Sequence, residues 1–187
     1  MKPHAASSRS VEDLLKFTKR GVRPKFVFFW GHTPRIPGRV DQSCLSNWFP
    51  AMFRIESTIY STTEQFMMAE KARLFSDSEI REKIISAGSP GKVKALGRQV
   101  RGFNEDVWIE HRFQIVVNGN YAKFHQNKEL GQFLLETGTK VLVEASPHDR
   151  IWGIGMGSDD SRAQDPTRWQ GLNLLGFALM EVRSRLT

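Results

Sequence analysis

Glu64 and Lys71 have the side-chain types and the spacing for chemistry on a sugar. They are seven residues apart in a segment of helical periodicity, so they share one face, two turns apart. A carboxylate and an ammonium group facing one cleft could serve as acid or base and as an anchor for a phosphate or ring oxygen. The alternative is structural: Glu64 ends a capping-box pattern at 61–64, and Lys71 lies on a solvated helix face.

A second carboxylate, Asp149, follows Pro147 and precedes Trp152 by three residues. A carboxylate in a tight turn beside an aromatic wall could handle a sugar ring or a base. The alternative is a turn in which the carboxylate only bonds nearby backbone amides.

Glycines follow at 153, 155 and 157, but their spacing is not that of a dinucleotide-binding loop, and acidic residues come next. We therefore exclude a Rossmann site, although Gly153 could still allow close backbone approach to a ligand. Asn173 and Gly176 lie near the start of the last predicted helix. They could place a ligand near exposed helix amides, or act as an N-cap and a packing glycine.

The composition is that of a globular protein with a substantial core. The chain has 187 residues, 40% of them hydrophobic, and no apolar run is long enough to span a membrane. The first 20 residues are polar and unlike a secretory signal. A single cysteine, Cys44, cannot form an internal disulfide, so we expect a reduced, cytoplasmic protein. The five histidines are not spaced as metal ligands.

The net charge of +7 is unevenly distributed, because residues 1–60 carry ten basic and four acidic side chains. A positive field favours phosphorylated partners, from sugar phosphates to nucleic acid. The alternative is a solvated basic tail. We predict such a tail at residues 1–25, with a short helix that begins near Ser10, and one domain at residues 26–187.

Hydrophobic periodicity predicts more helix than strand. We expect short strands at 26–30, around 53–59 and at 140–144, and a surface loop at 158–170. The predicted helices are at about 61–75, 78–86, 89–98, 105–124, 128–137 and 171–185, and Asn118-Gly119-Asn120 could break the fourth. The predicted fold class is therefore α+β, a compact, helix-rich single domain with a few short strands.

Five sequence blocks, in this order, resemble the NADAR family, also called YbiA-like, over about residues 26–185. The blocks are Leu45-Ser46-Asn47-Trp48-Phe49, Thr63-Glu64-Gln65-Phe66-Met67-Met68-Ala69-Glu70-Lys71-Ala72, Tyr121-Ala122-Lys123-Phe124, Asp149-Arg150-Ile151-Trp152-Gly153-Ile154-Gly155, and Gly171-Leu172-Asn173-Leu174-Leu175-Gly176 with Leu179-Met180 and Val182-Arg183.

The resemblance implies N-glycosidase chemistry on ribose-linked bases in a mainly helical α+β domain, without metal or organic cofactor. One branch of the family cleaves early riboflavin-pathway phosphoribosylamino-pyrimidines and releases ribose 5-phosphate. Another removes ADP-ribose from modified guanine. The expected partner is thus a phosphorylated ribosyl small molecule, with ADP-ribosylated nucleic acid as the alternative and no membrane. A non-catalytic module that binds ADP-ribose or an NAD-like ligand is a further alternative.

Cleavage of a ribosyl C–N bond builds positive charge at C1′, which a fixed carboxylate can stabilise. We predict Glu64 first and Asp149 second for stabilising that charge or activating water. Lys71 would hold a ribose hydroxyl or phosphate, or attack C1′ to form a Schiff base with the opened sugar. These three are the predicted catalytic residues.

The predicted substrate-binding residues combine aromatic, cationic and polar groups from the family blocks. Trp48 and Trp152 would stack the heterocycle. Lys123 ranks first for the phosphate, ahead of Arg35, Arg39, Arg98 and Arg101. The full set is Asn47, Trp48, Lys123, Trp152, Gly153, Asn173 and Gly176.

Overall fold

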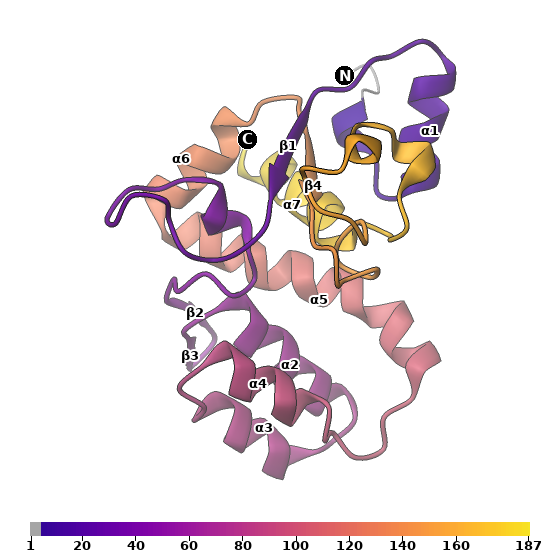
Figure 1. Cartoon of the computed structure of the whole chain (residues 1–187). Coiled ribbons are helices and arrows are strands. Elements are labelled where there is room, and N and C mark those ends of the chain that lie inside the picture. The colour runs from indigo at the N-terminus through magenta and orange to yellow at the C-terminus, as the bar shows by residue number, and fades with distance from the viewer. Residues whose placement is uncertain (1–4) are drawn as a thin grey trace. The chain divides into compact units, whose positions relative to one another are not determined.

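The computed structural model describes residues 5–187, which divide into two compact units. The first contains the chain up to Ser46 together with Glu129–Thr187, and the second is Asn47–Lys128. Residues 1–4 of the predicted tail lie outside the described residues. Helices dominate both units and strands are few and short, which confirms the helix-rich α+β class (Figure 1). The predicted boundary at residue 25 stays a prediction.

The first unit is built on two parallel strands and one packed helix. β1 (Phe26–Phe29) pairs with β4 (Val141–Glu144), and Phe26 stands opposite Val141. The helix α7 (Leu174–Leu186) packs against β4, as Figure 1 shows for the yellow C-terminal helix. Leu142 and Leu179 have no exposed surface, so the core of this unit lies between β4 and α7. α6 (Lys128–Glu136) precedes β4 in the chain.

The N-terminal part of the first unit forms the predicted short helix, α1 (Val11–Lys19). Its start at Ser10 is confirmed, because the Ser10 hydroxyl accepts from the Asp13 amide at 3.1 Å. Leu14 is fully buried, and α1 contacts a 3-10 helix at Pro166–Arg168.

The segment at 158–170 is more structured than the predicted surface loop. It contains 3-10 helices at Ser161–Gln164 and Pro166–Arg168, and Ala163 and Pro166 are buried. The Trp169 indole donates to the Ala163 carbonyl at 2.8 Å and so ties the segment to itself. Further 3-10 helices lie at Ala5–Ser7 and Gln42–Leu45.

The second unit is a helical cluster with one hairpin. β2 (Phe53–Ile55) and β3 (Thr58–Tyr60) are antiparallel. The central helix is α2 (Thr63–Leu74), which contacts each of the other helices of the unit. These are α3 (Ser78–Ile85), α4 (Pro90–Gly97) and α5 (Glu105–Gln126). The predicted start of α4 is confirmed, with Ser89 as N-cap and Pro90 as first residue.

The helix α5 continues without a break through Asn118-Gly119-Asn120. Gly119 faces α2, where a Cβ atom would lie 2.5 Å from the Phe66 ring and 3.1 Å from Thr63. The glycine therefore lets the two helices approach closely and does not end α5. Of the helices in residues 5–187, α5 included, none combines the length and apolarity needed to cross a bilayer.

Candidate active site

The start of α2 differs from the predicted capping box by one residue. Thr62 is the N-cap, since its hydroxyl accepts from the Gln65 amide at 3.1 Å, and Gln65 Oε1 accepts in return from the Ser61 amide at 2.8 Å. The capping role predicted for Glu64 is therefore wrong. Glu64 lies in the first helical turn, 5% exposed, where the helix dipole favours a negative charge.

The Glu64 backbone fixes the chain that precedes α2. Its amide donates to the Asn47 carbonyl at 2.9 Å. The Asn47 side chain is held as well, because Asn120 Nδ2 donates to Asn47 Oδ1 at 3.1 Å and to the Val116 carbonyl at 3.0 Å. The Thr63 hydroxyl donates to Asn120 Oδ1 at 3.4 Å. All of these polar groups are buried, so the network sets one position for Asn47.

Asn120 is the residue that the sequence analysis missed. In the sequence, only its polar type and its place three residues before Lys123 set it apart. In the structure it contacts Thr63 of α2.

Ammonium groups lie beside both aromatic rings of residues 47–49, which we call the 47–49 segment. Lys94 Nζ, from α4, is 5.8 Å from the Trp48 ring centroid. Lys123 Nζ, from α5, is 5.5 Å from the Phe49 centroid and 5.0 Å from that of Phe124. Lys123 has no exposed surface, which is rare for a lysine and expensive unless its charge is compensated. Two ammonium groups thus lie beside the aromatic rings of the segment, and one of them is fully buried.

Lys71 occupies different surroundings from Glu64. The two residues are separated by about 10 Å of helical rise. Lys71 Nζ donates to the Gly97 carbonyl at 2.9 Å and lies 4.1 Å from the Phe103 ring centroid. Burial lowers the pKa of the Lys71 ammonium group, which increases the share of neutral amine at a given pH. Met68, which lies between them in the chain, packs on Gly97.

In the first unit, Asp149 forms the backbone turn that the structural alternative predicts. Its Oδ1 accepts from the amides of Ile151 and Trp152, both at 2.8 Å. The Asp149 carbonyl accepts from the Gly155 amide at 3.0 Å. This turn positions the half-buried Trp152 ring.

Asn173 bonds to β4 and not to its own helix. Its backbone is left-handed, with φ of 52°, and its side chain makes no cap hydrogen bond to α7, so the predicted side-chain cap is wrong. Instead Nδ2 donates to the Leu142 carbonyl at 2.9 Å, and Oδ1 accepts from the Glu144 amide at 2.9 Å. A fully buried side chain thus bridges two peptide groups of the strand.

The glycines of this region are needed for close packing. A Cβ atom at Gly176 would lie 2.1 Å from the Leu142 carbonyl oxygen, and one at Gly153 would lie 2.8 Å from that of Glu144. The Gly153 carbonyl accepts from the Asn173 amide at 3.1 Å. Backbone therefore fills the space beside both glycines, and ligand contact at either position stays a prediction.

Of the arginines predicted for phosphate, Arg101 belongs to an ion pair. Its guanidinium donates to both carboxylate oxygens of the buried Asp77, at 2.6 and 3.1 Å. This pairing holds the pKa of Asp77 well below its usual range. Arg35, Arg39 and Arg98 are exposed.

Comparison with known proteins identifies relatives along most of the chain. A model of the NADAR domain matches residues 28–187. The N-glycosidase R617 of Acanthamoeba polyphaga mimivirus is 44% identical over 164 residues, 85% of this chain and 95% of that protein. The N-glycosidase Npun_R5314 of Nostoc punctiforme is 33% identical over 144 residues, 76% of this chain and 85% of that protein.

Two further proteins extend the comparison. The riboflavin biosynthesis protein VVA0006 of Vibrio vulnificus is 29% identical over 142 residues, which are 76% of this chain but 35% of that protein. The NMR structure of the E. coli protein YbiA superimposes with a TM-score of 0.70 at 27% identity, covering 88% of this chain and 86% of that one.

Proposed function

The chain belongs to the NADAR domain family, and we propose that it is an N-glycosidase that hydrolyses the C–N bond between ribose phosphate and a base. The substrates we propose are early riboflavin-pathway phosphoribosylamino-pyrimidines, with ribose 5-phosphate as product. Two N-glycosidases and a riboflavin biosynthesis protein among the relatives support this choice. The observation that carries the proposal is the buried Glu64, joined through its amide to the cation-lined 47–49 segment.

In the proposed reaction, the C1′–N bond breaks while positive charge develops at C1′. Water adds its oxygen to C1′, and a proton passes to the leaving nitrogen. The Glu64 carboxylate stabilises the charge or accepts the proton from water. Trp48 stacks the leaving base, and the ammonium groups of Lys94 and Lys123 attract the phosphate.

Lys71 offers a second route to the same products. In its neutral form the amine attacks C1′, the bond to the base breaks, and the opened sugar stays on the enzyme as a Schiff base until water releases it. The lowered pKa of Lys71 supports this route, because only the neutral amine is a nucleophile.

Asp149 is the second carboxylate that we propose for these tasks, with Trp152 as a second stacking surface. We rank Asp149 second to Glu64 as a catalytic candidate, because one of its carboxylate oxygens already accepts from two amides. In the second unit, Asn47 is proposed to shape the substrate site. Gly153, Asn173 and Gly176 of the first unit stay proposed substrate-binding residues.

Release of ADP-ribose from guanine in nucleic acid is the second candidate function. It is favoured by the ten basic and four acidic side chains of residues 1–60, since a positive field attracts a polyanion. A non-catalytic module for ADP-ribose would bind its ligand and release no product.

The test is product analysis by mass spectrometry with Glu64→Gln as the variant. We expect ribose 5-phosphate from a phosphoribosylamino-pyrimidine, and a rate about 10²–10⁴-fold lower in Glu64→Gln than in the wild type. Glu70→Gln is the matched control, because Glu70 lies on the same helix and pairs with the exposed Arg73 at 2.8 Å. Its rate should stay within about twofold, since surface ion pairs contribute little.

The other outcomes separate the alternatives. Free ADP-ribose from ADP-ribosylated guanosine DNA alone would move the proposal to the nucleic-acid reaction. Bound ligand without any product would indicate the binding module. Full activity in a folded Glu64→Gln protein would remove Glu64 from the mechanism.

A further inference from the structure

The connection between α1 and β1 carries a dense group of cations. Residues 19–25, which we call the basic connection, comprise the last residue of α1 and the chain that leads to β1. They contain Lys19, Arg20, Arg23 and Lys25 and no acidic residue. All four are exposed. Within residues 5–187, none of them forms an ion pair with a carboxylate, whereas Lys16 of α1 pairs with Asp13 at 3.1 Å. The positive charge of the connection is therefore available to an external anion.

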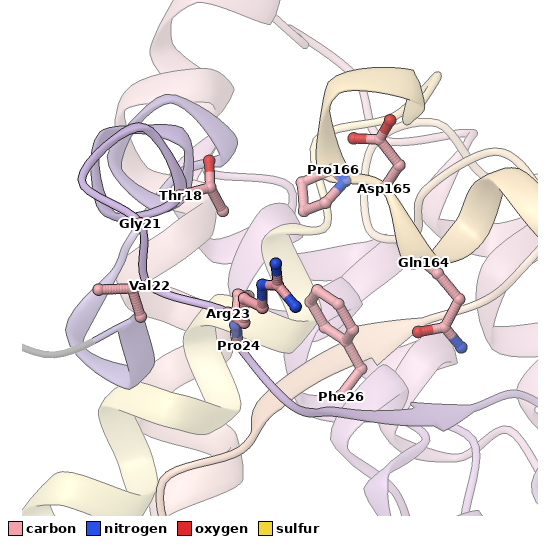
Figure 2. Close-up of a pocket in the computed structure, with 9 residues that line it drawn as sticks. All are labelled: Thr18, Gly21, Val22, Arg23, Pro24, Phe26, Gln164, Asp165 and Pro166. Atoms are coloured by element: carbon pink, nitrogen blue, oxygen red, sulfur yellow. The ribbon is translucent and has the colours of Figure 1, made fainter.

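A cavity of about 340 Å³ opens beside this connection (Figure 2). Its walls are apolar at Val22, Pro24, Phe26 and Pro166, and polar at Arg23 and Gln164. All of these residues belong to the first unit. The volume lies at the lower end of the range for small-ligand pockets, about 300–1,000 Å³, and suits a single base or nucleoside.

The aromatic wall of the cavity is held in place. The Phe26 ring meets the Trp169 ring edge-on at 5.9 Å between centroids and lies 5.7 Å from the Phe28 ring. Because Phe26 is half-buried in β1, its ring cannot turn away freely. A fixed aromatic face in a recess is a stacking platform for a flat heterocycle.

The charges orient such a ligand. The carboxylate of Asp165 lines the cavity and opposes a phosphate next to it. Arg23 lines the cavity as well, and the exposed Lys19, Arg20 and Lys25 adjoin lining residues in the sequence. A heterocycle would thus enter the cavity, with its phosphates near Arg23 and Lys25. Several cations close together in the chain can bind several phosphates at once. A polynucleotide offers successive phosphates along its backbone, whereas a mononucleotide does not.

We propose that the basic connection and its cavity bind single-stranded nucleic acid, with one base against Phe26 and backbone phosphates on Lys19, Arg20, Arg23 and Lys25. A single strand is required, since a base in a duplex is stacked and cannot enter a recess. A membrane surface fits less well, because lipid anchoring needs a projecting apolar face and this site is hollow. The site shares no residue with the proposed catalytic groups.

The test is fluorescence anisotropy of the whole chain with labelled oligo-dT and oligo-rU of twelve nucleotides, at 25 to 200 mM salt. We expect saturable binding that weakens with salt, with a slope of about −3 in log K against log [salt] for four phosphate contacts. Arg23→Gln with Lys25→Gln should weaken binding about tenfold or more and reduce the slope by about 1.4. Phe26→Leu should weaken binding about fivefold or more at constant charge.

Lys92→Gln with Lys128→Gln is the matched control, since both lysines are exposed and belong to the second unit, outside the basic connection. It should change affinity less than twofold, and thermal melting should verify folding of each variant. Equal loss of oligonucleotide affinity in both double variants would show that binding depends only on net charge, and it would contradict the proposed site. No saturable binding at 25 mM salt, or unchanged affinity in Phe26→Leu, would also overturn it.

Two further measurements separate neighbouring explanations. Binding to phosphatidylserine vesicles but not to oligonucleotides, lost in the Arg23→Gln, Lys25→Gln variant, would assign the patch to membranes and overturn the proposal. Release of ribose 5-phosphate from a free small substrate should be equal in that variant and the wild type. Failure of the nucleic-acid site is thus distinguishable from failure of the proposed N-glycosidase activity.

Discussion

The two regions that carry the predicted site residues differ in what their polar groups bond to. Around the 47–49 segment, side chains also bond to one another, as Asn120 does to Asn47 in addition to the Val116 carbonyl, and ammonium groups lie near aromatic rings. Around residues 149–157 and 173, side chains bond to backbone. Asp149 accepts from two amides, and Asn173 bonds to one carbonyl and one amide of β4.

This difference indicates that one region mainly serves the reaction and the other mainly serves the stability of the fold. Side chains that complete the hydrogen bonds of a strand or a turn maintain shape, and their loss destabilises the fold. Buried charged groups cost folding free energy and are retained mainly where chemistry needs them. We therefore expect substitutions in the first region to reduce rate and those in the second to reduce stability, with Glu64→Gln as the largest effect on rate.

Asn173→Ala should produce the largest loss of stability in the second region. Without its side chain, the Leu142 carbonyl and the Glu144 amide lose their partners, so we expect the free energy of unfolding to fall by about 2–4 kcal/mol. Urea denaturation measures the loss. Turnover per folded molecule should change only a few-fold.

Asn173→Gly is the control for backbone strain. Glycine tolerates the φ of 52° but lacks the two hydrogen bonds, so it should be more stable than the alanine variant by about 1 kcal/mol and remain below the wild type. A stable Asn173→Ala protein with greatly reduced turnover would instead place Asn173 against substrate.

Substitutions of Asp149 should have a smaller effect on stability. They also distinguish a role of its negative charge in the reaction from a role of its hydrogen bonds in the turn. Asp149→Ala removes an acceptor from two amides in an exposed turn, for a loss of about 1 kcal/mol, whereas Asp149→Asn keeps the acceptor and should lose less than about 0.5 kcal/mol. If the turn is its role, Asp149→Asn also keeps its rate. A rate loss of about 10²-fold in that stable variant would make Asp149 an electrostatic partner of the reaction.

The smallest expected effect is the pH dependence set by Lys71. Burial lowers its pKa in the fold, while the unfolded chain keeps the ordinary value of about 10.4. Between these two pKa values the unfolded state holds more protons, so the free energy of unfolding rises as pH increases through that window. In Lys71→Met this rise should vanish, as denaturation at several alkaline pH values would reveal. An identical pH profile in both proteins would contradict partial burial of the ammonium group.

Local pattern predicted most of the elements but not the bonds between them. Ser10 and Ser89 begin helices as expected, because a cap depends on a few adjacent residues. The cap of α2 lies one residue later than predicted. Ser61 and Thr62 both carry a hydroxyl that can cap a helix, and the choice depends on Gln65 bonding back to the Ser61 amide.

The candidate site was harder to predict, since it depends on long-range contacts. Asn120 appeared as a residue that could break a helix, yet its partner Asn47 is 73 residues away in sequence. Asn173 looked like a cap because sequence places it before α7, and only the fold brings it to β4. The spacing of neighbouring residues in the sequence predicts neither the Asn120–Asn47 contact nor the contact of Asn173 with β4.

The outer edge of β4 has a consequence for self-association. A strand edge with unpaired amides and carbonyls can recruit a strand from another molecule and begin aggregation. Here Asn173 takes the Leu142 carbonyl and the Glu144 amide, and Met180 Sδ accepts from the Leu142 amide at 3.4 Å. Side chains thus occupy hydrogen-bonding groups on this edge of β4. The two-stranded sheet therefore ends here without a third strand, and a strand from another molecule finds fewer groups to pair with.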